Sequence, residues 1–271
     1  MRKLLGAMFV ITCLITTIYA QEKVIRKGTL QVVSVARSPQ PEYASIQIVM
    51  PENGQMKTKT PIIMQVKVRG FPIGIDSMLP RKNEIFNSDM GQNIHVVIDN
   101  DIYFVKTTQR IDNFQDQGDY YEAGYQFNLP NLSPGMHTIR TFLCRSYNES
   151  LKTRESFDAG YFYYRNETPL KGVDLSKPYL TYNEPSPDHI YKEGKPIMLD
   201  FYIKNCELSK DGYTVMLIID KNVVRELEKW TPYFIYGLKK GKHEIELQLI
   251  DEKDKIEPGI FNDLKKTIRV E

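Results

Sequence analysis

A twelve-residue stretch occurs twice in this chain and constrains its fold more than any other feature. Residues 132–143 read LSPGMHTIRTFL, and residues 238–249, 106 positions later, read LKKGKHEIELQL. Each copy joins an apolar residue, a turn closed by glycine and a segment that opens with histidine. Glycine suits the turn because such turns often need a positive φ. In the second copy Ile245, Leu247 and Leu249 alternate with polar residues, which is the period of a half-buried strand. The repeat therefore predicts two related, strand-rich domains.

Further segments extend the repeat along the chain. Residues 61–69 correspond to 196–204, 91–99 to 212–220, 125–129 to 233–238, and 161–164 to 266–270. Two earlier strands are expected at 29–35 and 43–50. Many short strands without a helical period predict an all-β chain with two tandem antiparallel β-sandwich domains of the immunoglobulin-like or fibronectin type III-like kind.

The N-terminus has the pattern of a secretory signal peptide over residues 1–20. Arg2 and Lys3 precede an apolar run, and Ala20 is a small residue before the predicted cleavage point. An uncleaved membrane anchor and a lipoprotein using Cys13 are the alternatives. The expected domains are 21–168 for a first sandwich with long loops, 169–195 for a linker with the first strand region of the second, and 196–271 for the second sandwich.

Charge and cysteine content limit the partners and the redox chemistry. The chain has 36 Lys and Arg against 34 Asp and Glu, and loss of the predicted signal peptide leaves 34 against 34. Such a balance predicts no nucleic-acid partner, because those binders carry a basic excess. Cys144 and Cys206 remain, one in each predicted domain. They form either a disulfide across the domains or two largely buried thiols.

Several segments resemble a group of exported bacterial proteins of unknown function. They are PYLTY at 178–182, LDFY at 199–202, WTPY at 230–233 and GKH at 241–243, preceded by PGMHTIR at 134–140 and SYNES at 146–150. The similarity covers most of residues 125–271. It implies a bacterial envelope protein with tandem sandwich domains, and it implies no activity.

Unequal spacing between the copies points to a candidate binding surface. The first copy has 38 positions from Pro61 to Asp99 and 36 from there to Gly135, against 24 and 21 in the second copy. The first domain therefore has extra loops near 71–90 and 106–123, and antiparallel geometry places both at the same end as the loop 146–158. Loops gathered at one end of a sandwich often bind ligands. The alternative is that they cover edge strands.

Aromatic and arginine side chains in these loops are the candidate ligand contacts. Such side chains favour recognition of proteins or sugars. The candidate ligand-binding residues are Tyr120, Tyr121, Tyr147 and Arg145.

Catalytic and metal-binding patterns are weak in this sequence. His137 and His243 hold equivalent strand-start positions, which favours hydrogen-bonded structural histidines. Cys144 lies an odd number of positions from His137, so the two side chains should leave opposite faces of one strand. The Asp99 turn fits a hairpin better than a calcium loop. No metal or other cofactor is expected.

Acidic residues in the second long loop form a further weak calcium candidate, because they lack the glycine and glutamate of a hand motif. They are Asp112, Asp116 and Asp119.

The sequence therefore predicts a non-enzymatic, exported binding or scaffolding protein of the bacterial cell envelope. Its partner would be an envelope protein or a polysaccharide, in the periplasm, on the outer surface or secreted, with no membrane span after signal cleavage. The alternative is a carbohydrate-binding accessory module whose exposed loop tyrosines stack on sugar rings. A third hypothesis is a hydrolase with paired carboxylates, such as Asp119 with Glu122 or Glu149 with Glu155.

Overall fold

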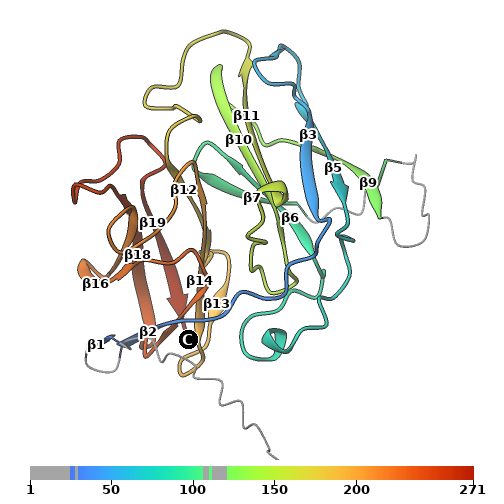
Figure 1. Ribbon diagram of the computed structural model, residues 1–271. Helices are drawn as coiled ribbons and strands as arrows, with labels where there is room; N and C mark the ends of the chain where they lie inside the picture. Colours follow the sequence, from blue (N-terminus) through green and yellow to red (C-terminus); the bar gives the residue numbers. More distant parts are fainter. Residues whose placement is uncertain (1–24, 28–29, 106–109, 112–120) are drawn as a thin grey trace, which may run out of the picture.

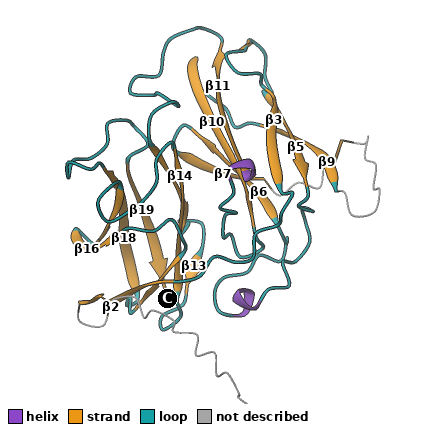
Figure 2. Ribbon diagram, viewed as in Figure 1, coloured by secondary structure: helices purple, strands orange, loops and turns teal. Residues whose placement is uncertain are grey.

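The computed structural model describes residues 25–27, 30–105, 110–111 and 121–271 (Figure 1). This part of the chain is built from strands and loops, with two one-turn 3-10 helices, η1 (Pro80–Asn83) and η2 (Arg154–Ser156) (Figure 2). Within these ranges no helix is both long and apolar enough to cross a membrane. The predicted signal peptide lies outside the described residues.

The first sandwich packs two sheets against each other. One sheet runs in the order β3 (Ser45–Met50), β5 (Ile63–Arg69), β9 (Glu122–Asn128) and β8 (Arg110–Ile111). The other runs β4 (Met56–Lys57), β11 (Phe157–Tyr164), β10 (Gly135–Cys144), β6 (Asn93–Ile98) and β7 (Asp101–Val105). The pairs are antiparallel except β4 with β11, which is parallel. Apolar side chains from both sheets form one core.

The second sandwich repeats this order. One sheet runs β1 (Ile25–Lys27), β2 (Leu30–Ser34), β17 (Tyr233–Tyr236), β14 (Ile197–Lys204) and β12 (Tyr179–Glu184). The other runs β13 (Ile190–Tyr191), β19 (Asp263–Val270), β18 (Gly241–Ile250), β15 (Thr214–Ile219) and β16 (Asn222–Leu227). The predicted fold class, two tandem antiparallel sandwiches, is confirmed.

The repeated motif behaves as its pattern predicts. Gly135 and Gly241 both have positive φ angles, 136° and 139°. In β18 the side chains of Ile245, Leu247 and Leu249 are fully buried in the second core, while the residues between them lie on the outer face. The turn glycine therefore has the same backbone conformation in both copies of the motif.

The N-terminal strand β2 belongs to the second sandwich, not to the first. It pairs antiparallel with β17, with Val32 opposite Ile235, and Val32 is fully buried in the second core. The predicted range 21–168 for the first domain is wrong in this respect. In the first sandwich the corresponding place beside β9 is taken by β8, which comes from the long loop that the second copy lacks. In the second sandwich β2, from the N-terminal part of the chain, takes the equivalent position beside β17.

The two sandwiches share a buried interface (Figure 1). Strands β6, β10, β12 and β14 are buried on both faces, because one face lies in the core of its own sandwich and the other meets the partner sandwich. A separate apolar cluster lies there and includes Phe142, Phe157, Tyr179 and Tyr202. The chain crosses this interface twice, first through residues 35–44, which lead from β2 to β3, and again after β11.

The predicted structural histidines hold the same hairpin in both sandwiches. His137 Nδ1 lies 2.8 Å from Asp99 Oδ2, and His243 Nδ1 lies 2.8 Å from Asp220 Oδ2. The other ring nitrogen of each histidine contacts a carbonyl four residues earlier, at 2.7 Å. Asp99 also accepts a 2.9 Å bond from the Thr138 amide, so the hairpin interpretation of this turn is supported.

These pairs should make stability fall at alkaline pH. The hydrogen bond with Asp99 raises the pKa of His137 above 6.5, and hydrogen bonds from His137 and Thr138 outweigh burial to lower the pKa of Asp99. Because the folded-state pKa of His137 exceeds the unfolded one, this stabilisation is complete below about pH 6.5 and is lost as pH rises through the folded value. We expect His137→Gln to cost about 1–2 kcal/mol at pH 6 and less at pH 8.5. Urea unfolding at both pH values measures this, and an equal cost at both would contradict it.

Candidate functional site

The candidate ligand-binding residues that the structure describes in the loops do not form the exposed surface that the sequence predicts. Tyr147 is 1% exposed, and its hydroxyl lies 2.6 Å from Ser38 Oγ. Arg145 is also buried, and its guanidinium donates to Gln92 and to the Pro39 carbonyl. Tyr121 is half-buried, and its hydroxyl bonds to that of Tyr125. Tyr120 lies outside the described residues, as do the acidic calcium candidates of the same loop. The exposure expected of Tyr147 and Arg145 is therefore wrong, and ligand binding by the four residues stays a prediction.

The loop 146–158 is buried because it packs on the chain that crosses between the sandwiches. Glu149, 1% exposed, accepts hydrogen bonds from the Ser38 amide and hydroxyl, both at 2.7 Å, and forms an ion pair with Arg81 of η1. The loop near 71–90 contacts it through the Ser88 amide, which donates to the Ser146 carbonyl at 2.8 Å. Phe86 stacks on His189 of the second sandwich at 3.9 Å. These loops therefore build the interface, which explains their length without a ligand.

Charged groups lie at the centre of the same interface. Lys152 Nζ is 2.6 Å from Asp200 Oδ1, and both side chains are fully buried. The other carboxylate oxygen, Oδ2, accepts bonds from Ser150 Oγ at 2.6 Å and Asn183 Nδ2 at 2.8 Å. Lys152 and Ser150 belong to the first sandwich, whereas Asp200 and Asn183 belong to the second, and all four side chains are buried. This cluster joins the two sandwiches and is not a candidate site for chemistry.

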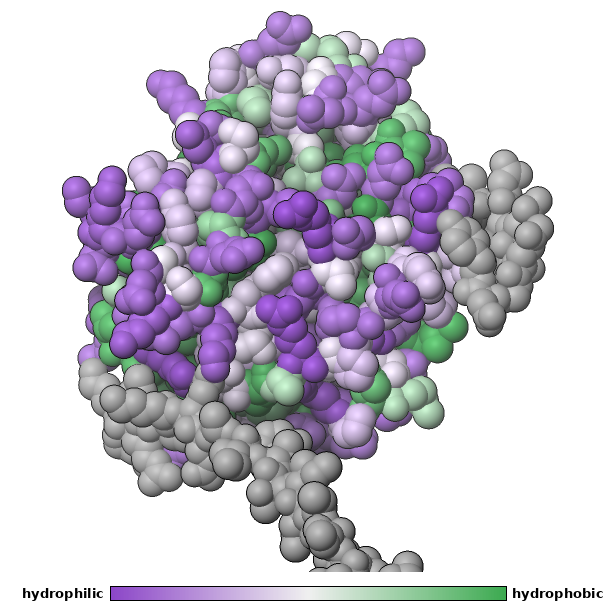
Figure 3. Space-filling view, viewed as in Figure 1, coloured by the Kyte–Doolittle hydropathy of each residue, from purple (hydrophilic) through white to green (hydrophobic). Residues whose placement is uncertain are grey.

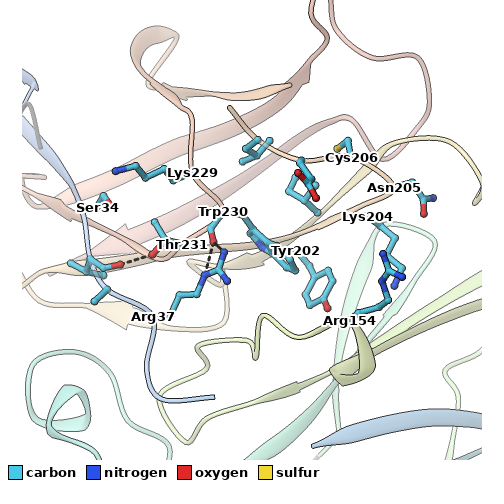
Figure 4. Close-up of a pocket in the computed structure, with 15 residues that line it drawn as sticks. Ser34, Arg37, Arg154, Tyr202, Lys204, Asn205, Cys206, Lys229, Trp230 and Thr231 are labelled. Atoms are coloured by element: carbon cyan, nitrogen blue, oxygen red, sulfur yellow. Dashed lines mark hydrogen bonds between the residues drawn. The ribbon is translucent and has the colours of Figure 1, made fainter. Parts of the chain in front are cut away.

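At the rim of the interface the surface opens into a groove of about 1150 Å³, which we call the Trp230 groove (Figure 4). Four separate segments line it: residues 34–37 from the end of β2 onward, Arg154 in η2, residues 202–208 at the end of β14, and residues 229–231 before β17. Arg154 comes from the first sandwich and the other segments pack with the second. The groove therefore exists only when the two sandwiches and the N-terminal segment are assembled.

Trp230 presents the aromatic surface of this groove and packs against Tyr202, which is 1% exposed (Figure 4). The rings meet edge to face, with centroids 4.7 Å apart. Trp230 Nε1 donates to the Phe201 carbonyl at 2.9 Å, and Arg37 Nε donates to the Trp230 carbonyl at 2.8 Å. Trp230 is half-buried, so it packs against the second core and also presents part of its indole to the groove. The ring is held in place before any ligand arrives.

The groove is also rich in cations. Its lining contains Arg37, Arg154, Lys204 and Lys229 against a single carboxylate, Glu207. Burial lowers the pKa of Arg37, and burial followed by the charge of Arg154 lowers the pKa of Lys204. An anion that approaches favours the charged form of both side chains and so opposes the effects of desolvation and of a neighbouring like charge. The groove is thus suited to a ligand with a flat apolar face and negative charge.

The lining lacks the groups that hydrolysis or nucleophilic catalysis needs. Glycosidases use two carboxylates, and this groove has only Glu207. Burial raises the pKa of the Cys206 thiol to about 12, which keeps it protonated and a poor nucleophile. Cys144 and Cys206 are free thiols, so the disulfide alternative is not found. Within the described ranges no three His, Cys, Asp or Glu residues are grouped to hold a metal ion.

Comparison with known proteins gives no family. No family model matches the chain, and no curated protein matches it. Among solved structures, the fibronectin(III)-like modules of Clostridium thermocellum CbhA align over 83% of this chain and 94% of theirs, with 11% identity and a TM-score of 0.27.

Two other solved structures align over less of their own length. Dimeric latent PorU from Porphyromonas gingivalis aligns over 86% of this chain and 20% of its own, with 15% identity and a TM-score of 0.27. Bacteroides ovatus SGBP-B, solved with a mixed-linkage heptasaccharide, aligns over 84% and 47%, with 14% identity and a TM-score of 0.19. With TM-scores this low, the three likenesses carry no argument about this protein's function.

Proposed function

We propose that this protein is a non-enzymatic, exported binding protein of the bacterial envelope that holds a polysaccharide in the Trp230 groove. The groove is the single observation that carries the proposal. It presents a fixed, partly exposed indole beside hydrogen-bonding and charged side chains. Sugar rings bind through an apolar face and a polar rim, which is the combination that this lining offers.

The face seen in Figure 3 suits a polysaccharide better than a folded protein. Figure 3 shows that the viewed face carries mainly hydrophilic side chains, with hydrophobic ones in small scattered groups. A stable protein interface would need a contiguous patch with an apolar centre. A groove closed on several sides instead suits an extended chain of small rings.

Replacing Trp230 with alanine should weaken polysaccharide binding by about 2 kcal/mol, or roughly thirtyfold, because a central aromatic side chain dominates such a contact. Calorimetric titration of envelope polysaccharides into wild-type and Trp230→Ala protein measures this. Trp230→Phe keeps an aromatic ring and should retain most of the binding. Tyr43, 71% exposed and outside the groove, provides the matched control Tyr43→Ala, which should bind as wild type does.

Two outcomes would contradict the proposal. Trp230→Ala protein that remains folded, as judged by its circular dichroism, yet binds as tightly as wild type would exclude the groove. Release of reducing sugar ends from a bound polysaccharide would make the protein a hydrolase.

A further inference from the structure

We infer that the Trp230 groove selects an acidic polysaccharide, a linear chain that carries uronic-acid carboxylates. This inference rests on the proposed function and adds the chemical class of its ligand. Three features carry it: the excess of cations in the lining, the lack of ion pairs at three of those cations, and the position of the aromatic rings between them.

Cations are in excess in the groove lining but not in the chain as a whole. Over the whole sequence, 36 Lys and Arg nearly balance 34 Asp and Glu. The groove lining has four of these cations against one carboxylate. The cations come from segments that are far apart in the sequence, so no local charge run explains their meeting. A local positive field in an otherwise balanced protein selects and steers an anionic ligand.

Three of the groove cations also lack the ion pairs that some other surface cations of this protein make. Lys82 lies 2.5 Å from Asp76, and Lys265 lies 3.2 Å from Glu246. By contrast, Arg37, Arg154 and Lys204 form no ion pair with any residue in the described part of the chain. Arg37 uses its guanidinium on the Trp230 carbonyl.

Three nearby carboxylates, Glu149, Glu155 and Asp158, lie outside the groove lining. Glu155 and Asp158 are close enough to favour the charged form of Lys204, and Glu149 acts likewise on Arg37. Glu149, however, is already paired with Arg81, and Asp158 Oδ2 accepts the Ile48 amide at 2.7 Å. Arg154 and Lys204 remain neighbouring like charges, an arrangement that an incoming carboxylate would stabilise.

The order of groups along the groove fits a sugar acid. Arg37 lies toward one end and Arg154 with Lys204 toward the other, with Trp230 and Tyr202 between them (Figure 4). An indole ring accepts the apolar face of a pyranose, while a guanidinium fork such as that of Arg154 matches a carboxylate with two parallel hydrogen bonds. The Arg37 guanidinium lies over the indole, 5.3 Å from the ring centroid, and donates to the Trp230 carbonyl through Nε and Nη2, so it contributes positive charge rather than a free fork. Nucleic acid fits less well, because its regular phosphates need a longer row of cations than this groove provides.

The test compares four probes on the intact protein by calorimetry at low salt: polygalacturonate, alginate, a neutral β-glucan and oligodeoxythymidylate. We expect the two uronates to bind at least about tenfold more tightly than the neutral glucan, and their affinity to fall as sodium chloride is raised from about 0.05 to 0.5 M. The double variant Arg154→Gln with Lys204→Gln should bind polygalacturonate about four- to twentyfold more weakly. Arg154 is exposed and Lys204 half-buried, at the end of β14.

A matched control removes the same charge elsewhere. Lys240→Gln with Lys253→Gln, both exposed and outside the groove, should leave the affinity for polygalacturonate unchanged. If both double variants weaken binding equally, the effect is one of net charge and the inference fails.

The probes separate this inference from the proposed function. Binding of the neutral glucan as tight as that of both uronates, and lost in Trp230→Ala, would overturn the acidic class and leave the proposed function standing. Oligodeoxythymidylate binding as tight as uronate binding would overturn the class in favour of a general polyanion site. No binding of any probe would overturn both.

Discussion

Val32→Asp should unfold the C-terminal sandwich, at a cost of more than about 4 kcal/mol, although Val32 stands near the opposite end of the sequence. Val32 is fully buried among the side chains of the second core, and its strand β2 completes the sheet beside β17. An aspartate there would place an unpaired carboxylate in an apolar core. It would also detach the strand that covers the edge of β17, and an uncovered edge strand promotes association.

Urea unfolding followed by tryptophan emission measures this effect, since Trp230 lies just before β17. Gln31→Asp is the matched control, because Gln31 is the neighbouring residue of β2 and its side chain leaves the opposite face. It should shift the midpoint little. A Val32→Asp protein with the wild-type midpoint would show that β2 is dispensable and that this pairing does not hold the second sandwich.

Lys152→Met is expected to cost about 3–5 kcal/mol, because it leaves the Asp200 carboxylate buried without its countercharge. Both side chains are fully buried, with 2.6 Å between Nζ and Oδ1. Lys152 also donates to the Phe201 carbonyl at 3.0 Å, but that carbonyl keeps the Trp230 Nε1 donor, so the cost comes mainly from the unpaired carboxylate. The two sandwiches would then separate more easily than either unfolds.

A double-mutant cycle isolates the pair itself. Asp200→Asn removes the buried charge while keeping an acceptor for Ser150, so Lys152→Met with Asp200→Asn should be more stable than Lys152→Met alone by at least about 1 kcal/mol. Chemical unfolding of the four proteins measures the coupling. Additive costs would mean that the two charges do not depend on each other.

Much of the fold can be predicted from the sequence because local patterns specify it. The alternation in β18 and the glycine turns at Gly135 and Gly241 depend only on neighbouring residues, and both are found. The partner of β2 could not be predicted, since an alternating strand of five residues fits the edge of either sandwich equally well. The second copy lacks the long loop that supplies β8 in the first. This difference is the one sequence feature that suggests an unpaired edge beside β17.

The interface between the sandwiches could not be predicted from the sequence, for a different reason. Polar residues such as Arg140 and Asp200 alternate with core residues, and this alternation predicts a solvent-facing side of their strands. They are buried because a second sandwich covers that side. The alternation of a strand does not reveal whether its polar face meets solvent or another domain. Tyr147 and Arg145 lie away from solvent because the segment that crosses between the sandwiches covers them through Ser38 and Pro39.

The Trp230 groove could not be predicted for the same physical reason. It is formed by four segments that are brought together only by the tertiary structure. Nothing in the spacing of Arg37, Arg154 and Lys204 predicts that they meet. The one available signal was that Trp230 is the only tryptophan of the chain and stands in a loop-like segment with proline.

That single tryptophan permits the most direct test of the groove as the ligand site. Its emission should be followed while polygalacturonate is titrated into the intact protein at low salt, with calorimetry run on the same samples. We expect a saturable shift of the emission to shorter wavelength, with the same midpoint as the heat, because a bound sugar ring would exclude water from the indole of Trp230. Heat that saturates while the emission stays unchanged would place the ligand elsewhere on the protein and would contradict binding in the Trp230 groove.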